Sequence, residues 1–191
     1  RVCSSSSAKT VLFIRHGQGD HNVSIKNWKL IDPHLNAAGR QQAKELAKRL
    51  GGAAGPLRSV ELVVTSPLTR AMQTARAAFE GVETRWAVSA LLRERMGAPC
   101  DEGLKASELL AQNPHMQTWE GADKLEEVWW TPGMEWHLFS RVAQLEEWVA
   151  SRPESTIALV GHGGLFTRVL GYHLHNCGHQ WVSWELGGGG K

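Results

Sequence analysis

The sequence has little cysteine, no long apolar run and no block of basic residues. Its cysteines, Cys3, Cys100 and Cys177, are odd in number and far apart, which excludes a disulfide framework and indicates a reducing compartment. No run approaches the roughly 20 apolar residues of a membrane-spanning helix. The strictly aliphatic stretches are short, such as 157–160. We therefore expect a soluble protein without a membrane partner.

An excess of charge of one sign is also missing. Lys and Arg number 21 against 19 Asp and Glu, a formal net charge of +2 that is spread along the chain. Proteins that bind the phosphate backbone of nucleic acids concentrate positive charge on one surface. The balanced charge therefore argues against a nucleic-acid partner.

What is present fits one globular domain. At 191 residues, 42% of them hydrophobic, such a chain buries roughly 70% of the surface that its unfolded form exposes. We predict a single domain over 1–191, with flexible tails at 1–9 and 187–191. The stretch at 1–10 is rich in serine and lacks acidic residues, and it is either an artificial chain end or the remnant of an organelle transit segment. We expect a cytoplasmic protein, with an organelle such as a plastid as the alternative.

Short apolar runs alternate with segments of helical periodicity. Strands are predicted at 11–14, 60–64 and 156–160, and helices at 36–50, 66–79, 104–112, 138–151 and 165–174. Asn36 is a predicted N-cap, Gly51-Gly52 a helix stop, and Pro67 the first residue of the second helix after Ser66. The weakly periodic segment 91–133 is interpreted as an excursion over the sheet. The alternation predicts a three-layer α/β/α domain with a mostly parallel sheet flanked by helices.

Three polar clusters follow predicted strands: Arg15-His16-Gly17, Ser66-Pro67 with Arg70, and Gly161-His162-Gly163. Ligands of such sheets bind outside the carboxyl ends of the strands, so one crevice can gather all three clusters. Arginine offers a planar fork of donors to phosphate, and a helix that starts with glycines offers free backbone N–H groups. We predict a pocket for a dianion that contains two imidazoles.

Residues 15–22 read Arg-His-Gly-Gln-Gly-Asp-His-Asn. They resemble the Arg-His-Gly-x-x-x-x-Asn signature of the histidine phosphatase superfamily, in its phosphoglycerate mutase-like branch. Four further blocks agree in order: Asp32-Pro33-x-Leu35-x-x-x-Gly39 with Gln42, Ser66-Pro67-Leu68-x-Arg70-x-x-Gln73-Thr74-Ala75, Leu92-Arg93-Glu94 and Gly161-His162-Gly163-Gly164. The likeness covers about 11–174. The first block and the run Pro99-Cys100-Asp101 are also similar to plant and fungal phosphoglycerate-mutase-like proteins.

The resemblance implies a phosphatase of the histidine acid phosphatase type, a phosphomonoesterase that hydrolyses a phosphorylated small molecule. His16 would be the nucleophile and become transiently phosphorylated, and Glu94 would be the general acid. The oxygen atoms of the phosphoryl group would be bound by Arg15, Asn22, Arg70, His162 and Gly163. Two arginines and a protonated histidine would supply the positive charge, so neither a metal nor another cofactor is expected.

Phosphoryl transfer places demands on three of these residues. His16 must attack as a neutral imidazole, so we expect its other nitrogen to donate to a backbone carbonyl such as that of Gly17. His162 should donate a hydrogen bond instead. Glu94 must hold a proton near neutral pH and give it to the leaving alkoxide. Its assignment rests on the motif, because Glu102 and Glu108 lie nearby.

Two other functions stay open. Phosphoglycerate mutase-type transfer fits the family, but the segment between Glu94 and the helix at 138 is short beside the lid of true mutases, which favours hydrolysis. A module that only binds a phosphorylated ligand would have no need of Glu94. Gly19 and Gly161 stand where many members have Ser or Thr. Neither departure changes the nucleophile or the phosphate-binding arginines.

Two residue groups have a plainer explanation. His173, His175, Cys177 and His179 match none of the usual zinc spacings, so no metal site is expected. The Trp-rich segment 119–136 is expected to pack into the core or to wall the pocket. Sugar phosphates, small phosphorylated acids, nucleotides and phosphoproteins are all candidate substrates. The sequence specifies no oligomeric state.

Overall fold

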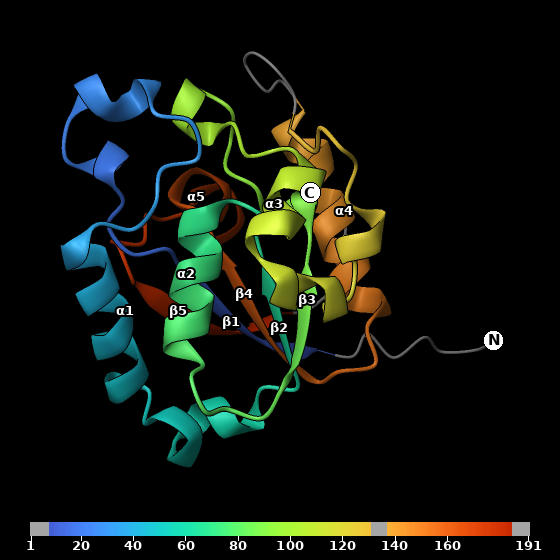
Figure 1. Ribbon diagram of the computed structural model, residues 1–191. Coiled ribbons are helices and arrows are strands. Elements are labelled where there is room, and N and C mark those ends of the chain that lie inside the picture. The colour runs from blue at the N-terminus through green and yellow to red at the C-terminus, as the bar shows by residue number, and fades with distance from the viewer. Residues whose placement is uncertain (1–7, 131–136, 185–191) are drawn as a thin grey trace.

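A five-stranded sheet in the order β3-β2-β4-β1-β5 forms the centre of the protein (Figure 1). The computed structural model describes residues 8–130 and 137–184. The strands are β1 (Lys9–Arg15), β2 (Leu62–Thr65), β3 (Arg85–Val88), β4 (Thr156–Gly161) and β5 (His179–Trp184). Every neighbouring pair is parallel except β1 and β5, which are antiparallel. The predicted mostly parallel sheet is confirmed.

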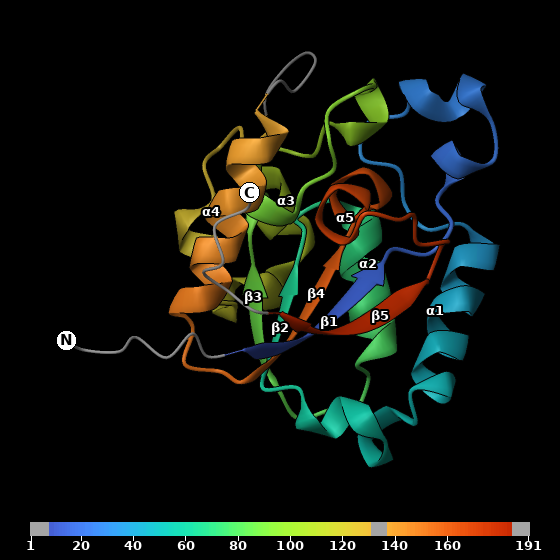
Figure 2. The same ribbon diagram turned by 180° about the vertical axis from the view of Figure 1, so that it is seen from behind.

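Helices cover both faces of the sheet, which gives the predicted three layers (Figures 1 and 2). The residues of α1 (Ala37–Arg49) and α2 (Thr69–Ala78) pack in one core, and those of α4 (Leu138–Ser151) and α5 (Gly163–Leu170) in the other. The excursion holds α3 (Ala106–Gln112) and several 3-10 helices. Among the described residues, no helix is long and apolar enough to cross a bilayer.

The strand β1 shows why the sheet sits between two cores. Successive side chains of a strand point to opposite faces, and Val11 and Phe13 enter the α4/α5 core while Leu12 and Ile14 enter the α1/α2 core. All four are at most 1% exposed. A strand that is apolar on both faces must be covered on both, so β1 lies inside the sheet between β4 and β5, and its carboxyl end is positioned with it.

The boundaries of α1, α3 and α4 follow the predictions to within two residues. The last helix, α5, spans Gly163–Leu170 instead of 165–174, and the chain leaves it through Gly171 in the left-handed region. The Asn36 side chain accepts the backbone N–H of Gly39 at 2.9 Å, and the chain leaves α1 through Gly51 in the left-handed region with φ +71°. The second helix, however, begins at Thr69 instead of Pro67, after Leu68 in an extended conformation. Leu68 therefore occupies the N-cap position in place of Ser66, whose hydroxyl contacts His162.

Three further differences concern the edges of the fold. The strands β3 and β5 were not predicted, because β3 begins with the exposed Arg85 and forms no continuous buried apolar run, and β5 mixes polar residues with half-buried tryptophans. Lys9, expected in the flexible tail, is the first residue of β1 and is 7% exposed. Its ammonium donates to the carbonyl oxygens of Arg152 at 2.6 Å and Glu154 at 3.0 Å. Residues 1–7, with Cys3, and the predicted tail 187–191 lie outside the described residues.

The tryptophans of the excursion pack as predicted where they are described. Trp119 and Trp129 are 8% and 5% exposed, and they belong to two small cores beside the main ones. Trp136 lies outside the described residues. Neither Trp119 nor Trp129 lines the cavity that holds the candidate catalytic residues.

Gly39 supports the loop that follows β1. Alanine within a helix is ordinarily more stable than glycine by roughly 0.5–1 kcal/mol. A Cβ at position 39 would overlap the carbonyl oxygen of Gln18, so alanine is expected to be less stable than glycine at this position. We predict that Gly39→Ala lowers the free energy of unfolding by about 1–3 kcal/mol in urea denaturation. The exposed Gln41→Ala in the same helix should stay within about 0.5 kcal/mol of the native value, and equal values for both variants would contradict this role.

Candidate active site

The predicted site residues converge at the carboxyl ends of β1, β2 and β4. Arg15 ends β1, His162 follows β4, and Arg70 lies in the first turn of α2 after β2. The rings of His16 and His162 lie 5.0 Å apart between centroids. A cavity of about 380 Å³ opens beside them, lined by the predicted Arg15, His16, Asn22, Arg70 and Glu94.

His16 is held in the tautomer that a nucleophile requires. Its side chain is 1% exposed, and its Nδ1 lies 2.7 Å from the carbonyl oxygen of Gly17. A carbonyl can only accept, so the proton is on Nδ1 and Nε2 carries the lone pair. Burial and the nearby charges of Arg70 and Arg15 hold the pKa of His16 well below its usual value. The predicted contact with Gly17 is confirmed, and the imidazole is neutral.

His162 is oriented by Ser66. The His162 Nε2 lies 2.8 Å from the Ser66 hydroxyl, which also accepts the backbone N–H of Leu68 at 3.2 Å. We infer that the Ser66 hydroxyl donates to Nε2, which leaves the ring proton on Nδ1. Burial and the charge of Arg70 lower the pKa of His162 well below its usual value. His162 therefore donates as a neutral imidazole, and the cations of the site are the arginines.

Arg15 is fixed by residues from the segment that follows α5. Its Nη1 donates to the carbonyl oxygen of Leu174 at 2.8 Å and lies 2.7 Å from His173 Nε2. The other ring nitrogen of His173 lies 3.4 Å from the hydroxyl of Thr167, which itself donates to the carbonyl of Gly163 at 2.7 Å. This chain of contacts sets His173 to accept from Arg15. His173 thus positions a guanidinium.

Arg70 is buried and is held by the loop that contains Asp101. It is 1% exposed, its Nη1 donates to the Cys100 carbonyl at 2.7 Å, and its Nη2 lies 3.4 Å from Asp101 Oδ1. The second Asp101 oxygen accepts the N–H groups of Gly97 and Ala98 at 3.1 and 3.2 Å. Burial raises the pKa of Asp101 to about 6, Arg70 opposes the rise and Glu94 adds to it.

Glu94 joins its loop to the start of α5. Its carboxylate accepts the backbone N–H of Arg95 at 2.7 Å and those of Gly164 and Leu165 at 3.0 Å each. The expectation of free N–H groups at this helix start is therefore wrong for Gly164 and Leu165. Gly163 is the first residue of α5, and Glu94 does not accept its backbone N–H. A Cβ on Gly163 would come within 3.1 Å of Arg15 Nε, so glycine lets Arg15 pack closely there.

Asn22 lines the mouth of the cavity. Its Oδ1 accepts the N–H of Gly19 at 3.0 Å and lies 3.3 Å from the Asn176 side-chain amide nitrogen. The oxygen is thus engaged within the protein, and the amide nitrogen is the end with hydrogen atoms to offer an anion.

Four buried nitrogen atoms in this site find no hydrogen-bond partner among the described residues: Arg15 Nε, His21 Nδ1, Arg70 Nε and His162 Nδ1. A buried polar group without a partner costs roughly 1–3 kcal/mol. The guanidinium groups and the Nδ1–H of His162 are donors. Their clustering makes the site complementary to an anion with several oxygen atoms.

Eight lining residues were not predicted as site residues, and those with charged, imidazole or indole side chains are His21, Trp28, Arg95 and Asp101. Burial and the two arginine charges lower the pKa of His21 to about 3, so it is neutral. Ser66 was interpreted as a helix cap. The position of Asp101 directly after Pro99-Cys100, in a motif noted in the sequence, was the available signal for its place here.

The sequence profile described as "Histidine phosphatase superfamily (branch 1)" matches residues 11–187. The chain belongs to the histidine phosphatase superfamily. A phosphoglycerate mutase-like protein of Arabidopsis thaliana is 30% identical over 208 residues, which cover 88% of this chain and 76% of the relative. A Mycobacterium tuberculosis protein named glucosyl-3-phosphoglycerate phosphatase is 31% identical over 171 residues, which cover 83% and 72%.

A solved structure agrees with this histidine phosphatase fold. The mycobacterial glucosyl-3-phosphoglycerate phosphatase in complex with VO3 has a TM-score of 0.56 at 27% identity. The match covers 94% of this chain and 100% of that chain. The resemblance predicted from the motif blocks is therefore confirmed at the level of the family and the fold.

Asp101→Asn isolates the buried carboxyl group. Because the pKa of Asp101 is raised, the folded protein binds this proton more tightly than the unfolded chain, and stability falls as pH rises from about 4 to about 6. We predict that native stability falls relative to the variant over this range, by at most about 3 kcal/mol at roughly 1.36 kcal/mol per pKa unit. Urea denaturation at several pH values measures the difference, since titrations shared by both proteins cancel. Parallel profiles would exclude the effect.

Proposed function

We propose that the protein is a metal-independent phosphomonoesterase that hydrolyses a phosphorylated small molecule through a phosphohistidine on His16. The observation that supports this most strongly is the set of buried, unpartnered nitrogens around a neutral imidazole whose Nε2 carries the lone pair. The family and the phosphatases among the relatives point to the same reaction.

In the first step, His16 Nε2 attacks the phosphorus atom and the bond to the leaving oxygen breaks. Arg15 and Arg70 bind the phosphoryl oxygens and balance their charge, and His162 Nδ1 donates a hydrogen bond. The Asn22 amide at the cavity mouth and the Gly163 N–H at the start of α5 donate hydrogen bonds to the same phosphoryl group. Such a transition state needs mainly alignment and charge stabilisation, which fixed guanidinium groups supply.

In the second step, water attacks the phosphorus of phosphohistidine and the P–N bond breaks. A carboxylate takes the proton of the water, and inorganic phosphate leaves. The same carboxyl group gave its proton to the leaving alkoxide in the first step, so the proton taken from water restores it. The neutral His16 is thereby restored with its proton still on Nδ1.

Two carboxyl groups line the cavity, those of Glu94 and Asp101, and either is a candidate for the general acid–base. We assign this role to Glu94 from its place in the Leu92-Arg93-Glu94 block and because, unlike Asp101, it is not within ion-pair distance of Arg70. Both carboxylates accept backbone N–H groups, Glu94 from three residues and Asp101 from two. Asp101 then acts by positioning Arg70.

The cavity limits the substrate. About 380 Å³ holds a phosphate and a modest organic group, at the lower end of the roughly 300–1,000 Å³ of small-molecule sites. Trp28 and Arg95 line it beyond the phosphate-binding residues and are the side chains available to the organic group. A small phosphomonoester fits this volume.

His16→Ala is the direct test. We predict that the native protein releases inorganic phosphate from small phosphomonoesters in the presence of a metal chelator, and that the variant releases none above background. The exposed His137→Ala is the matched control and should retain native activity. Full activity of His16→Ala would overturn the proposal. No release by the native protein would favour a binding module or a primed mutase.

The leaving group distinguishes the two carboxyl residues. A proton donor matters for an alkyl phosphate and little for p-nitrophenyl phosphate, whose leaving group is stable as an anion. We predict that Glu94→Gln lowers kcat on glycerol phosphate about 10²–10⁴-fold with a much smaller loss on p-nitrophenyl phosphate. Asp101→Asn should slow both substrates alike, because Arg70 serves both. The reverse pattern would make Asp101 the donor.

A further inference from the structure

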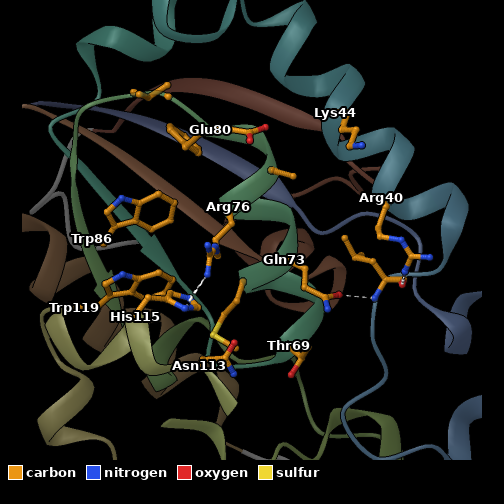
Figure 3. Close-up of a pocket in the computed structure, with 16 residues that line it drawn as sticks. Arg40, Lys44, Thr69, Gln73, Arg76, Glu80, Trp86, Asn113, His115 and Trp119 are labelled. Carbon is orange, nitrogen blue, oxygen red and sulfur yellow. Dashed lines mark hydrogen bonds between the residues drawn. The ribbon is translucent and has the colours of Figure 1, made fainter. Parts of the chain in front are cut away.

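A second cavity lies over the outward face of α2, apart from the catalytic pocket (Figure 3). Its volume is about 770 Å³, against about 380 Å³ for the catalytic cavity. It is bordered by α1, by α2, by Trp86 of β3 and by the 3-10 helix η7 (Pro114–Thr118). None of the proposed catalytic residues lines it.

Three cations line this cleft with one carboxylate. Arg40 and Lys44 project from α1 and Arg76 from α2, whereas Glu80 is the one acidic residue in the lining (Figure 3). Within 8–130 and 137–184, none of the three cations meets a carboxylate at ion-pair distance. The cleft therefore carries uncompensated positive charge from two different helices.

An aromatic wall faces these cations. The rings of Trp86 and Trp119 stack at 5.0 Å with an interplanar angle of 18°, and His115 meets Trp119 edge-on at 5.3 Å. Arg76 Nη1 lies 2.7 Å from His115 Nε2, which joins the charged part of the cleft to the aromatic part. Burial lowers the pKa of His115, and the Arg76 charge adds to this, so its imidazole is neutral and can accept.

We propose that this cleft binds a ligand of the nucleotide class, a planar aromatic ring that carries two or more negative charges. The volume lies within the roughly 300–1,000 Å³ of small-molecule sites. The indole wall suits a flat ring, since bases stack on aromatic side chains. Cations on two helices can contact more than one anionic group, and guanidinium suits phosphate oxygens in particular.

The cleft has no free hydroxyl nucleophile among its lining residues. Thr69 is the one hydroxyl in the lining, and it is committed to Asp32, whose carboxylate accepts its Oγ1–H at 2.6 Å and its backbone N–H at 2.9 Å. The next residue is Arg70 of the catalytic pocket. The two sites thus share the first turn of α2, while their ligand-binding side chains are separate.

Calorimetric titration with ADP tests the proposal. We expect ADP to bind the native protein, and the exposed pair Lys44→Ala and Arg76→Ala to weaken binding about tenfold or more, which is roughly 1.4 kcal/mol or more. The control pair Lys48→Ala and Arg58→Ala removes the same charge from exposed residues outside the cleft and should bind as the native protein does. Adenosine, which lacks the phosphates, should bind more weakly than ADP.

Three outcomes would overturn the proposal: no binding of ADP to the native protein, equal weakening in the cleft pair and the control pair, or loss of ADP binding in Arg15→Ala with none in the cleft pair. The last would place ADP in the catalytic pocket. Phosphate release by the cleft pair should equal that of the native protein. This readout separates failure of the cleft proposal from failure of the phosphatase proposal.

Discussion

The positive charge of Arg70, buried at the start of α2, governs the chemistry of the surrounding site. It contributes to lowering the pKa values of His16, His21 and His162 and opposes the rise in the pKa of Asp101. A guanidinium with 1% exposure cannot be solvated by bulk water and needs fixed partners. The Cys100 carbonyl and Asp101 provide them, so the loop at 97–101 is as necessary to the site as the helix that carries Arg70.

A second constraint ties this loop system to the sheet. Glu94 accepts the backbone N–H groups of Gly164 and Leu165 in the first turn of α5, and α5 starts directly after His162, which follows β4. Negative charge at a helix N-terminus is stabilising, so the contact holds the acid-bearing loop against the strand end that presents the second imidazole. The arginines and the imidazoles are thus positioned by separate elements that share one sheet edge. That arrangement requires the sheet order β2-β4-β1, in which the three polar strand ends are neighbours.

The sequence predicted the elements whose signal is local. Apolar runs such as 11–14 and caps such as Asn36 depend on neighbouring residues, and both appear in the structure. The convergence of the motif blocks followed from the parallel sheet. Contacts between distant segments could not be obtained in this way: Ser66 meets His162 across 96 positions, and His173 meets Arg15 across 158. Strand β5 pairs with β1 at the edge of the sheet. It was missed because most of its residues are half-buried, so its sequence shows no clear alternation of apolar and polar residues.

The charge state of the site likewise depends on contacts between distant segments. The sequence analysis counted two arginines and a protonated histidine as the positive charges around a bound phosphate. Burial lowers the pKa values of His16 and His162, and the charge of Arg70 lowers them further, so the site keeps these imidazoles neutral and places its positive charge on arginine. Asp101 holds Arg70 in place. A phosphate dianion would take over part of that role and repel the Asp101 carboxylate, so binding of the dianion would favour protonation of Asp101. Phosphate binding and proton uptake would therefore be coupled through one carboxyl group that does not itself need to touch the reacting atoms.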